Sequence, residues 1–216
     1  MTSRPPLASI LLNPKLTERK VESAYSALKF FHIIGFVFMS VPLFNLIVVN
    51  ERAALGTSFN YDADRYMENI IRRGATRCFS FQATVFLTGV LLLVAGPLGI
   101  AALWGNGVLL AKTLLLFTLT GLLSYVHLRV QPTIDAILAT VRPDEPAPQD
   151  LMAQLKPHRV LRKRLATLCL FLVIVTIILG MQVYGRFSSV LTIVLVVLAG
   201  VFALRVNRTL VRFGWI

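Results

Sequence analysis

Long apolar runs separated by shorter polar segments dominate the sequence. Five such runs occur, at about Lys29–Val49, Cys78–Trp104, Val108–Leu128, Leu165–Tyr184 and Phe187–Leu204. A helix needs about 20 apolar residues to cross a bilayer core of about 30 Å. The runs do not alternate with the period of two that a membrane β-barrel requires. We therefore expect an all-α, polytopic transmembrane helical bundle with five spans, or four if the last two runs form an incomplete hairpin.

The composition supports a membrane protein. Hydrophobic residues make up 56% of the chain and charged residues 15%, whereas soluble domains average about 45–50% and about 25%. The 22 Lys and Arg outnumber the 10 Asp and Glu, a balance that can indicate nucleic-acid binding. Here the charges lie between the apolar runs, as in membrane loops. We expect the protein to associate with the lipid bilayer and not with nucleic acid. The sequence leaves open whether it also binds other membrane subunits or forms a homo-oligomer.

The polar segments divide the chain into four regions. Residues 1–28 form an N-terminal segment, 29–130 a three-span core, 131–164 a Pro-rich and basic cytoplasmic loop, and 165–216 a two-span hairpin with a basic tail. Apolar residues at helical spacing predict interfacial amphipathic helices at Pro14–Leu28 and Asp64–Arg73. Gly96-Pro97 is expected to end or kink the second span. Cations near the fourth span are expected to contact anionic lipid headgroups; they are Arg159, Arg162, Lys163 and Arg164.

The distribution of basic residues predicts the orientation. With five spans, one face receives the N-terminus and two short turns, with 6 Lys and Arg in total. The other face receives Asn50–Arg77, Arg129–Arg164 and the C-terminal tail, with 15. Positive residues prefer the cytoplasmic side. We therefore expect a multi-pass protein of a bacterial-type inner membrane, with its N-terminus outside and its C-terminus in the cytoplasm.

Few residues within the spans can carry chemistry. The sequence has no Cys-x-x-Cys, metalloprotease, phosphate-loop or nucleophile-elbow motif, and Cys78 and Cys169 are expected to be packing residues. His32 and Lys112 are different, because an ionisable group inside a span faces protein or water and is a candidate functional residue. Both lie within about 6–8 Å of the same face of the membrane, by a rise of about 1.5 Å per residue. His127 lies on the Lys112 helix but about 22 Å deeper, so it cannot share one metal ion with His32.

The sequence around His32 resembles a known group. Leu28-Lys29-Phe30-Phe31-His32-Ile33-Ile34-Gly35 is similar to the first helix of the CopD-like membrane proteins, which include the HemJ-type protoporphyrinogen oxidases. The run from Gly107 to His127, with Lys112 early and His127 late, resembles the third helix of that group. The resemblance covers about residues 25–130. It implies a core of four helices and, in the HemJ-type members, haem b bound by the first-helix His and a third-helix Lys, which here are His32 and Lys112.

The chain departs from that group after the histidine. The Trp-x-Gly-Gly element common there is replaced by Phe38-Met39-Ser40-Val41-Pro42, and a Pro-rich loop and a fifth span are added. The leading hypothesis is therefore a haem-associated membrane protein whose iron ligands are His32 and Lys112, with enzymatic activity left open. A neutral imidazole readily binds haem iron, whereas a lysine must first lose its proton. The alternatives are a non-catalytic structural subunit of a membrane complex and, last, a small transporter.

Overall fold

The described part of the protein is helical throughout. The computed structural model describes residues 14–55, 59–142, 148–183, 185 and 187–210, and these contain no strand. The long helices are α2 (Pro14–Leu55), α3 (Tyr61–Ala95), α5 (Gly107–Tyr125), α7 (Leu151–Met181) and α8 (Ser189–Arg208). Five helices in these ranges are long and apolar enough to cross a membrane, counting α5 together with its continuation. The expectation of an all-α bundle with five spans is confirmed.

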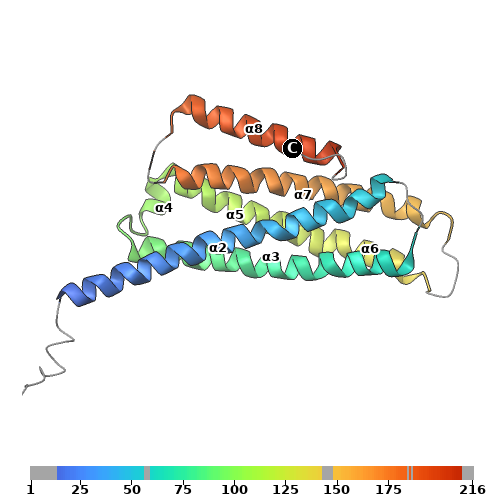
Figure 1. Cartoon of the computed structure of the whole chain (residues 1–216), viewed down its shortest axis with the longest axis horizontal. Coiled ribbons are helices and arrows are strands. Elements are labelled where there is room, and N and C mark those ends of the chain that lie inside the picture. Colours follow the sequence, from blue (N-terminus) through green and yellow to red (C-terminus); the bar gives the residue numbers. More distant parts are fainter. Residues whose placement is uncertain (1–13, 56–58, 143–147, 184, 186, 211–216) are drawn as a thin grey trace, which may run out of the picture.

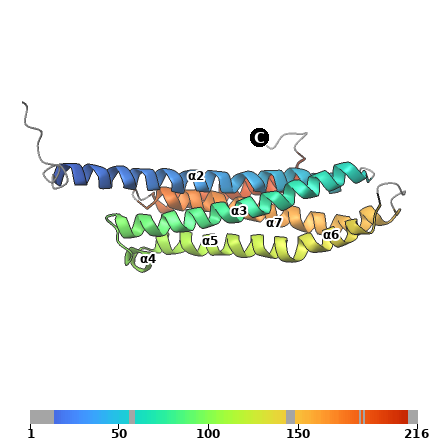
Figure 2. The ribbon, with the colours of Figure 1, turned by 90° about the horizontal axis from the view of Figure 1, so that it is seen from below.

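Four of the long helices form the core. Helix α2 packs along both α3 and α7, and α5 packs on α7 and, over a shorter stretch, on α3. Helix α8 lies outside this group, against α7 (Figure 1). Seen from below, α2 and α5 lie on opposite sides of the bundle (Figure 2). The innermost apolar contacts join α2, α3, α5 and α7; they involve Met39, Leu43, Cys78, Leu119, Cys169 and Val173.

The helices are longer than a membrane requires. At about 1.5 Å per residue, the 35 residues of α3 span roughly 52 Å, against about 30 Å of hydrocarbon. The excess lies at one end of the bundle, which we call the polar end. It consists of the end of α2 near Glu51, residues 61–77 of α3, the π-helical segment η1 (Val126–Val130) with helix α6 (Gln131–Ala139), and residues 151–164 of α7.

Two expectations from the sequence are wrong at the polar end. The predicted interfacial helix Asp64–Arg73 is part of the continuous helix α3, and its Asp64 and Glu68 are buried inside the bundle. The predicted loop 131–164 is largely helical, because α6 and the first four turns of α7 fall within it. Hydropathy marks these segments as non-membrane, but it does not show that they continue the helices. The Pro-rich residues 143–147 lie outside the described residues.

The first helix corrects a third expectation. Helix α2 runs from Pro14 to Leu55 as one element, so the predicted amphipathic segment Pro14–Leu28 continues into the first span. No Gly or Pro stands between Pro14 and Gly35 to break the backbone ladder. In both ribbon views the N-terminal part of α2 extends beyond the other helices (Figures 1 and 2).

The second span ends as expected. Helix α3 stops at Ala95, with Gly96 in an extended conformation. Gly99 then has φ = 69°, a left-handed conformation that suits glycine because it has no Cβ. The chain turns through the short helix α4 (Ala102–Gly105), where the side chain of Trp104 is 77% exposed. The prediction that Gly96-Pro97 ends this helix is confirmed.

Candidate functional site

His32 lies on α2 and faces α3. Its Nδ1 is 3.0 Å from Oγ1 of Thr88. The Thr88 hydroxyl donates its single hydrogen to the Thr84 carbonyl at 2.6 Å, so towards the neutral imidazole it acts as acceptor. In the tautomer that has its hydrogen on Nδ1, His32 donates to Thr88 and Nε2 carries the lone pair. Ligating histidines in metal sites share this arrangement, in which the second ring nitrogen donates to a neighbour.

Glycines allow the close approach of α2 and α3 around this histidine. A Cβ at Gly89 would lie 3.2 Å from Cε1 of His32, and a Cβ at Gly35 would lie 3.2 Å from a methyl group of Val85. Both distances are shorter than ordinary van der Waals contact. The absence of side chains at these two positions therefore places the imidazole directly against α3.

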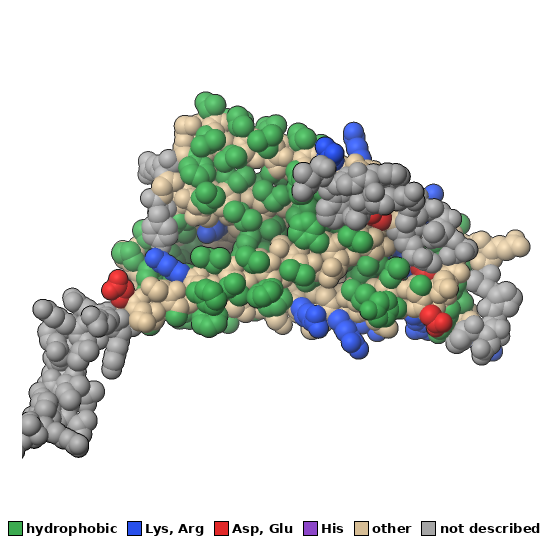
Figure 3. Space-filling view, in the orientation of Figure 1, with side chains coloured by type: hydrophobic (Ala, Val, Ile, Leu, Met, Phe, Trp, Pro, Cys, Tyr) green, Lys and Arg blue, Asp and Glu red, His purple; other side chains and the backbone are tan. Residues whose placement is uncertain are grey.

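Lys112 enters the same region from α5. Its Nζ lies against α7, where a Cβ at Gly180 would be 3.5 Å away. Within the described residues, no carboxylate or hydrogen-bond acceptor partners the ammonium group, although Lys112 is close enough to His32 to interact with it electrostatically. The bundle is hollowed between α2 and α7 on the face shown in Figure 3. The two predicted site residues thus lie on α2 and α5, within the range of electrostatic interaction.

His32 and Lys112 each present a nitrogen atom of a kind that can bind iron. The described residues contain no group of three His, Cys, Asp or Glu that could hold a metal ion.

The remaining candidate residues lie elsewhere. His127 is at the other end of the span, in η1, where its ring packs edge-on against Phe79 at 5.9 Å. Its Nδ1 is buried and has no hydrogen-bond partner among the described residues. Cys78 and Cys169 are both buried as free thiols in the apolar core, which agrees with a packing role.

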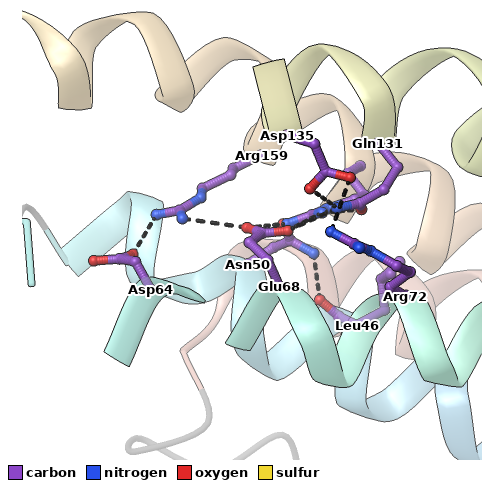
Figure 4. A network of polar contacts seen from close by, with 9 residues as sticks. Leu46, Asn50, Asp64, Glu68, Arg72, Gln131, Asp135 and Arg159 are labelled. Carbon is purple, nitrogen blue, oxygen red and sulfur yellow. Dashed lines mark hydrogen bonds and ion pairs between the residues drawn. The ribbon is translucent and has the colours of Figure 1, made fainter. Parts of the chain in front are cut away.

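A buried ionic network at the polar end is the largest polar feature of the described structure. Arg162 of α7 is fully buried and donates two hydrogen bonds to Glu68 of α3, at 2.6 and 2.9 Å. Arg162 also donates to Oδ1 of Asn50 on α2 at 2.9 Å and to Oε1 of Gln131 at 2.6 Å. Arg162 therefore ties together α2, α3, α6 and α7, and Figure 4 shows its partners Asn50, Glu68 and Gln131.

Three further ion pairs extend this network. Arg159 contacts Asp64 at 2.8 Å and Glu68 at 3.2 Å. Lys163 lies 3.6 Å from Glu51, at the end of α2. The three buried cations of α7 thus face three buried carboxylates, so the interior of the polar end is electrically balanced.

The network overturns the expected role of the basic residues before the fourth span. Arg159, Arg162 and Lys163 do not contact lipid headgroups, because all three are buried in the bundle; Arg164 is exposed. A signal for this was present in the sequence. The cations follow one another at i, i+3 and i+4, and Asp64 and Glu68 are separated by four residues, so each set lies on one helix face.

Comparisons of the chain with models of protein families, with curated proteins and with solved structures found no match. The class of protein therefore follows from the fold alone. The chain is a multi-pass integral membrane protein with five apolar helices.

Proposed function

We propose that this protein is a haem-associated integral membrane protein with a CopD-like scaffold, in which His32 and Lys112 are the axial ligands of haem b. The observation that carries the proposal is the state of the two nitrogens. The His32 tautomer that donates from Nδ1 to Thr88 has a lone pair on Nε2, and the ion pairs among the described residues do not include Lys112. Haem would supply one-electron redox chemistry at this place.

The arrangement of the helices supports the proposal. The resemblance implies a core of four helices, and α2, α3, α5 and α7 pack as such a core while α8 lies outside it. The first and third spans carry the two proposed ligands.

We further propose that the polar end faces the cytoplasm of a bacterial-type cell. The segments at this end carry most of the Lys and Arg, and the positive-inside rule places such segments on the cytoplasmic side. The His32–Lys112 site then lies near the outer face of the inner membrane.

The test is the visible absorption spectrum of the protein purified after expression with ample haem. We expect a Soret band, and we expect His32→Ala and Lys112→Met each to lose or shift it. Lys29→Met is the matched control, because Lys29 lies near the same end of the bundle, where its ammonium contacts the ring of Tyr25. Absence of a Soret band, or an unchanged band in both variants, would falsify the haem proposal. A protein that then co-purifies with other membrane proteins in mild detergent fits the structural-subunit alternative.

A further inference from the structure

A narrow cavity lies inside the four-helix core, between the polar end and the middle of the membrane. Its volume is about 40 Å³, and side chains of α2, α3, α5 with η1, and α7 line it. One end reaches Arg72, whose side chain is 51% exposed. The other end reaches Gln82, ten residues further along α3, which corresponds to about 15 Å of helix. The lining of the cavity thus extends along α3 from an exposed residue into the core.

Two buried polar atoms border this cavity without a partner. Oε1 of Gln82 and Nδ1 of His127 have no hydrogen bond within the described structure, and Gln82 is only 6% exposed. Nε2 of Gln82 has only a weak contact, at 3.9 Å, with Sγ of Cys78. An unsatisfied buried polar atom costs about 1–3 kcal/mol. Such atoms in native proteins normally bind ordered water.

We propose that the cavity is a water-filled passage from the polar end to Gln82, and that its water is held by Gln82 and His127. A buried water occupies roughly 10–15 Å³ on this scale, so the volume accommodates about three. The rest of the lining is mostly apolar, which leaves these two side chains to anchor the water.

Water in the passage reaches only a few ionisable groups. Arg72 on α3 is paired with Asp135 at 3.2 Å, and the others along the lining are His127 and the thiols of Cys78 and Cys169. The lining residues of α2 are apolar. This inference does not depend on haem.

The two thiols make the inference testable with water itself. Cys78 and Cys169 line the passage beyond its mouth, and in heavy water a wetted S–H group exchanges to S–D while the solvent gains the proton. Infrared spectroscopy of the full chain in lipid nanodiscs resolves the two bands. We expect both thiols to exchange soon after transfer to heavy water. In the double variant Gln82→Leu/His127→Phe we expect exchange to slow by about tenfold or more, since apolar cavities stay dry.

A second variant blocks the passage instead of drying it. Ala75→Leu places extra carbon atoms in the lining between Arg72 and Cys78, and we expect it to slow exchange as well. Ala83→Leu is the matched control on the exposed side of the same helix, and its rate should equal that of the native protein. Slow exchange in the native protein, or equal rates in the native protein and a folded blocked or apolar variant, overturns the proposal. Circular dichroism and size-exclusion chromatography identify the folded variants.

Discussion

Arg162 and Glu68 form a bidentate ion pair at the centre of the polar end, with both side chains almost completely removed from solvent. The pair joins α7 to α3 across 94 residues of sequence. Burying two charges is costly, and the attraction between them offsets that cost only while both are present.

Removal of one partner of this ion pair should therefore strongly destabilise the protein. We expect Arg162→Met to lower the free energy of unfolding by about 3–5 kcal/mol, since it removes the bidentate partner of the buried Glu68 and leaves this carboxylate only the longer contact with Arg159. Unfolding in mixed micelles with increasing SDS measures the change. In Glu68→Gln/Arg162→Met the loss should be smaller than in Arg162→Met alone; an equal or larger loss argues against the pair as the source of the effect.

An exposed ion pair of the same bundle provides the matched control. Arg72 and Asp135 lie 3.2 Å apart, but their side chains are 51% and 33% exposed. Solvent-exposed pairs contribute about 0–1 kcal/mol. Arg72→Met should thus change the unfolding free energy far less than Arg162→Met, and similar losses in the two variants would mean that burial does not determine the effect.

The hydrogen bond between His32 and Thr88 makes a second prediction. Thr88→Val keeps the shape of the side chain but removes the acceptor that fixes the ring hydrogen on Nδ1. Loss of such a partner typically weakens metal binding by about 10–100-fold. Haem retention, measured as the Soret absorbance per protein during transfer to apomyoglobin, should fall accordingly. Thr118→Val is the control, because its hydroxyl bonds only its own helix on an exposed face.

The glycine beside His32 makes a third prediction. Gly89→Leu inserts a side chain where even a Cβ would lie 3.2 Å from the imidazole, so the ring must move away from α3. We expect a shifted or lost Soret band with the helical content unchanged. Gly121→Leu, at a helix position with no neighbour within 4 Å of the added Cβ, should leave the spectrum as it is. An unaltered spectrum in Gly89→Leu would remove the close packing at Gly89 from the proposed site.

The proposed orientation, with the polar end and the C-terminus in the cytoplasm, leads to a fourth prediction. A C-terminal green fluorescent protein fusion should fluoresce, since this reporter matures in the cytoplasm, and a C-terminal alkaline phosphatase fusion should be inactive. The reverse pattern would place the polar end outside the cell and contradict the positive-inside assignment.

Hydropathy was sufficient to predict the membrane helices but not their full lengths. Long apolar runs such as Leu165–Tyr184 can only be satisfied as helices in lipid, and the structure agrees. The polar parts of α3 and α7 carry no such constraint, so Asp64–Arg73 was interpreted as an interfacial helix and 131–164 as a loop. What determines their structure is pairing between distant segments, such as Glu68 with Arg162, which local patterns do not encode.

The candidate site, like the helices, could be predicted only in part from the sequence. A charged or titratable residue inside an apolar run is visible in the sequence, so His32 and Lys112 could be identified, along with the depth they share. Their surroundings could not be predicted, because Thr88, Gly89 and Gly180 have no special meaning until the helices are packed. The environment of His127 depends on the π-helical turn at Val126–Val130, and one-turn π-bulges of this kind follow from tertiary context.

The ionic network also constrains the order in which the chain can be completed during synthesis. Asp64 and Glu68 leave the ribosome about ninety residues before Arg159 and Arg162. Until α7 is translated and inserted, the carboxylates of α3 lack their guanidinium partners and must stay hydrated. A nascent chain that ends before α7 therefore lacks the guanidinium partners of Asp64 and Glu68, and insertion of the fourth span supplies them.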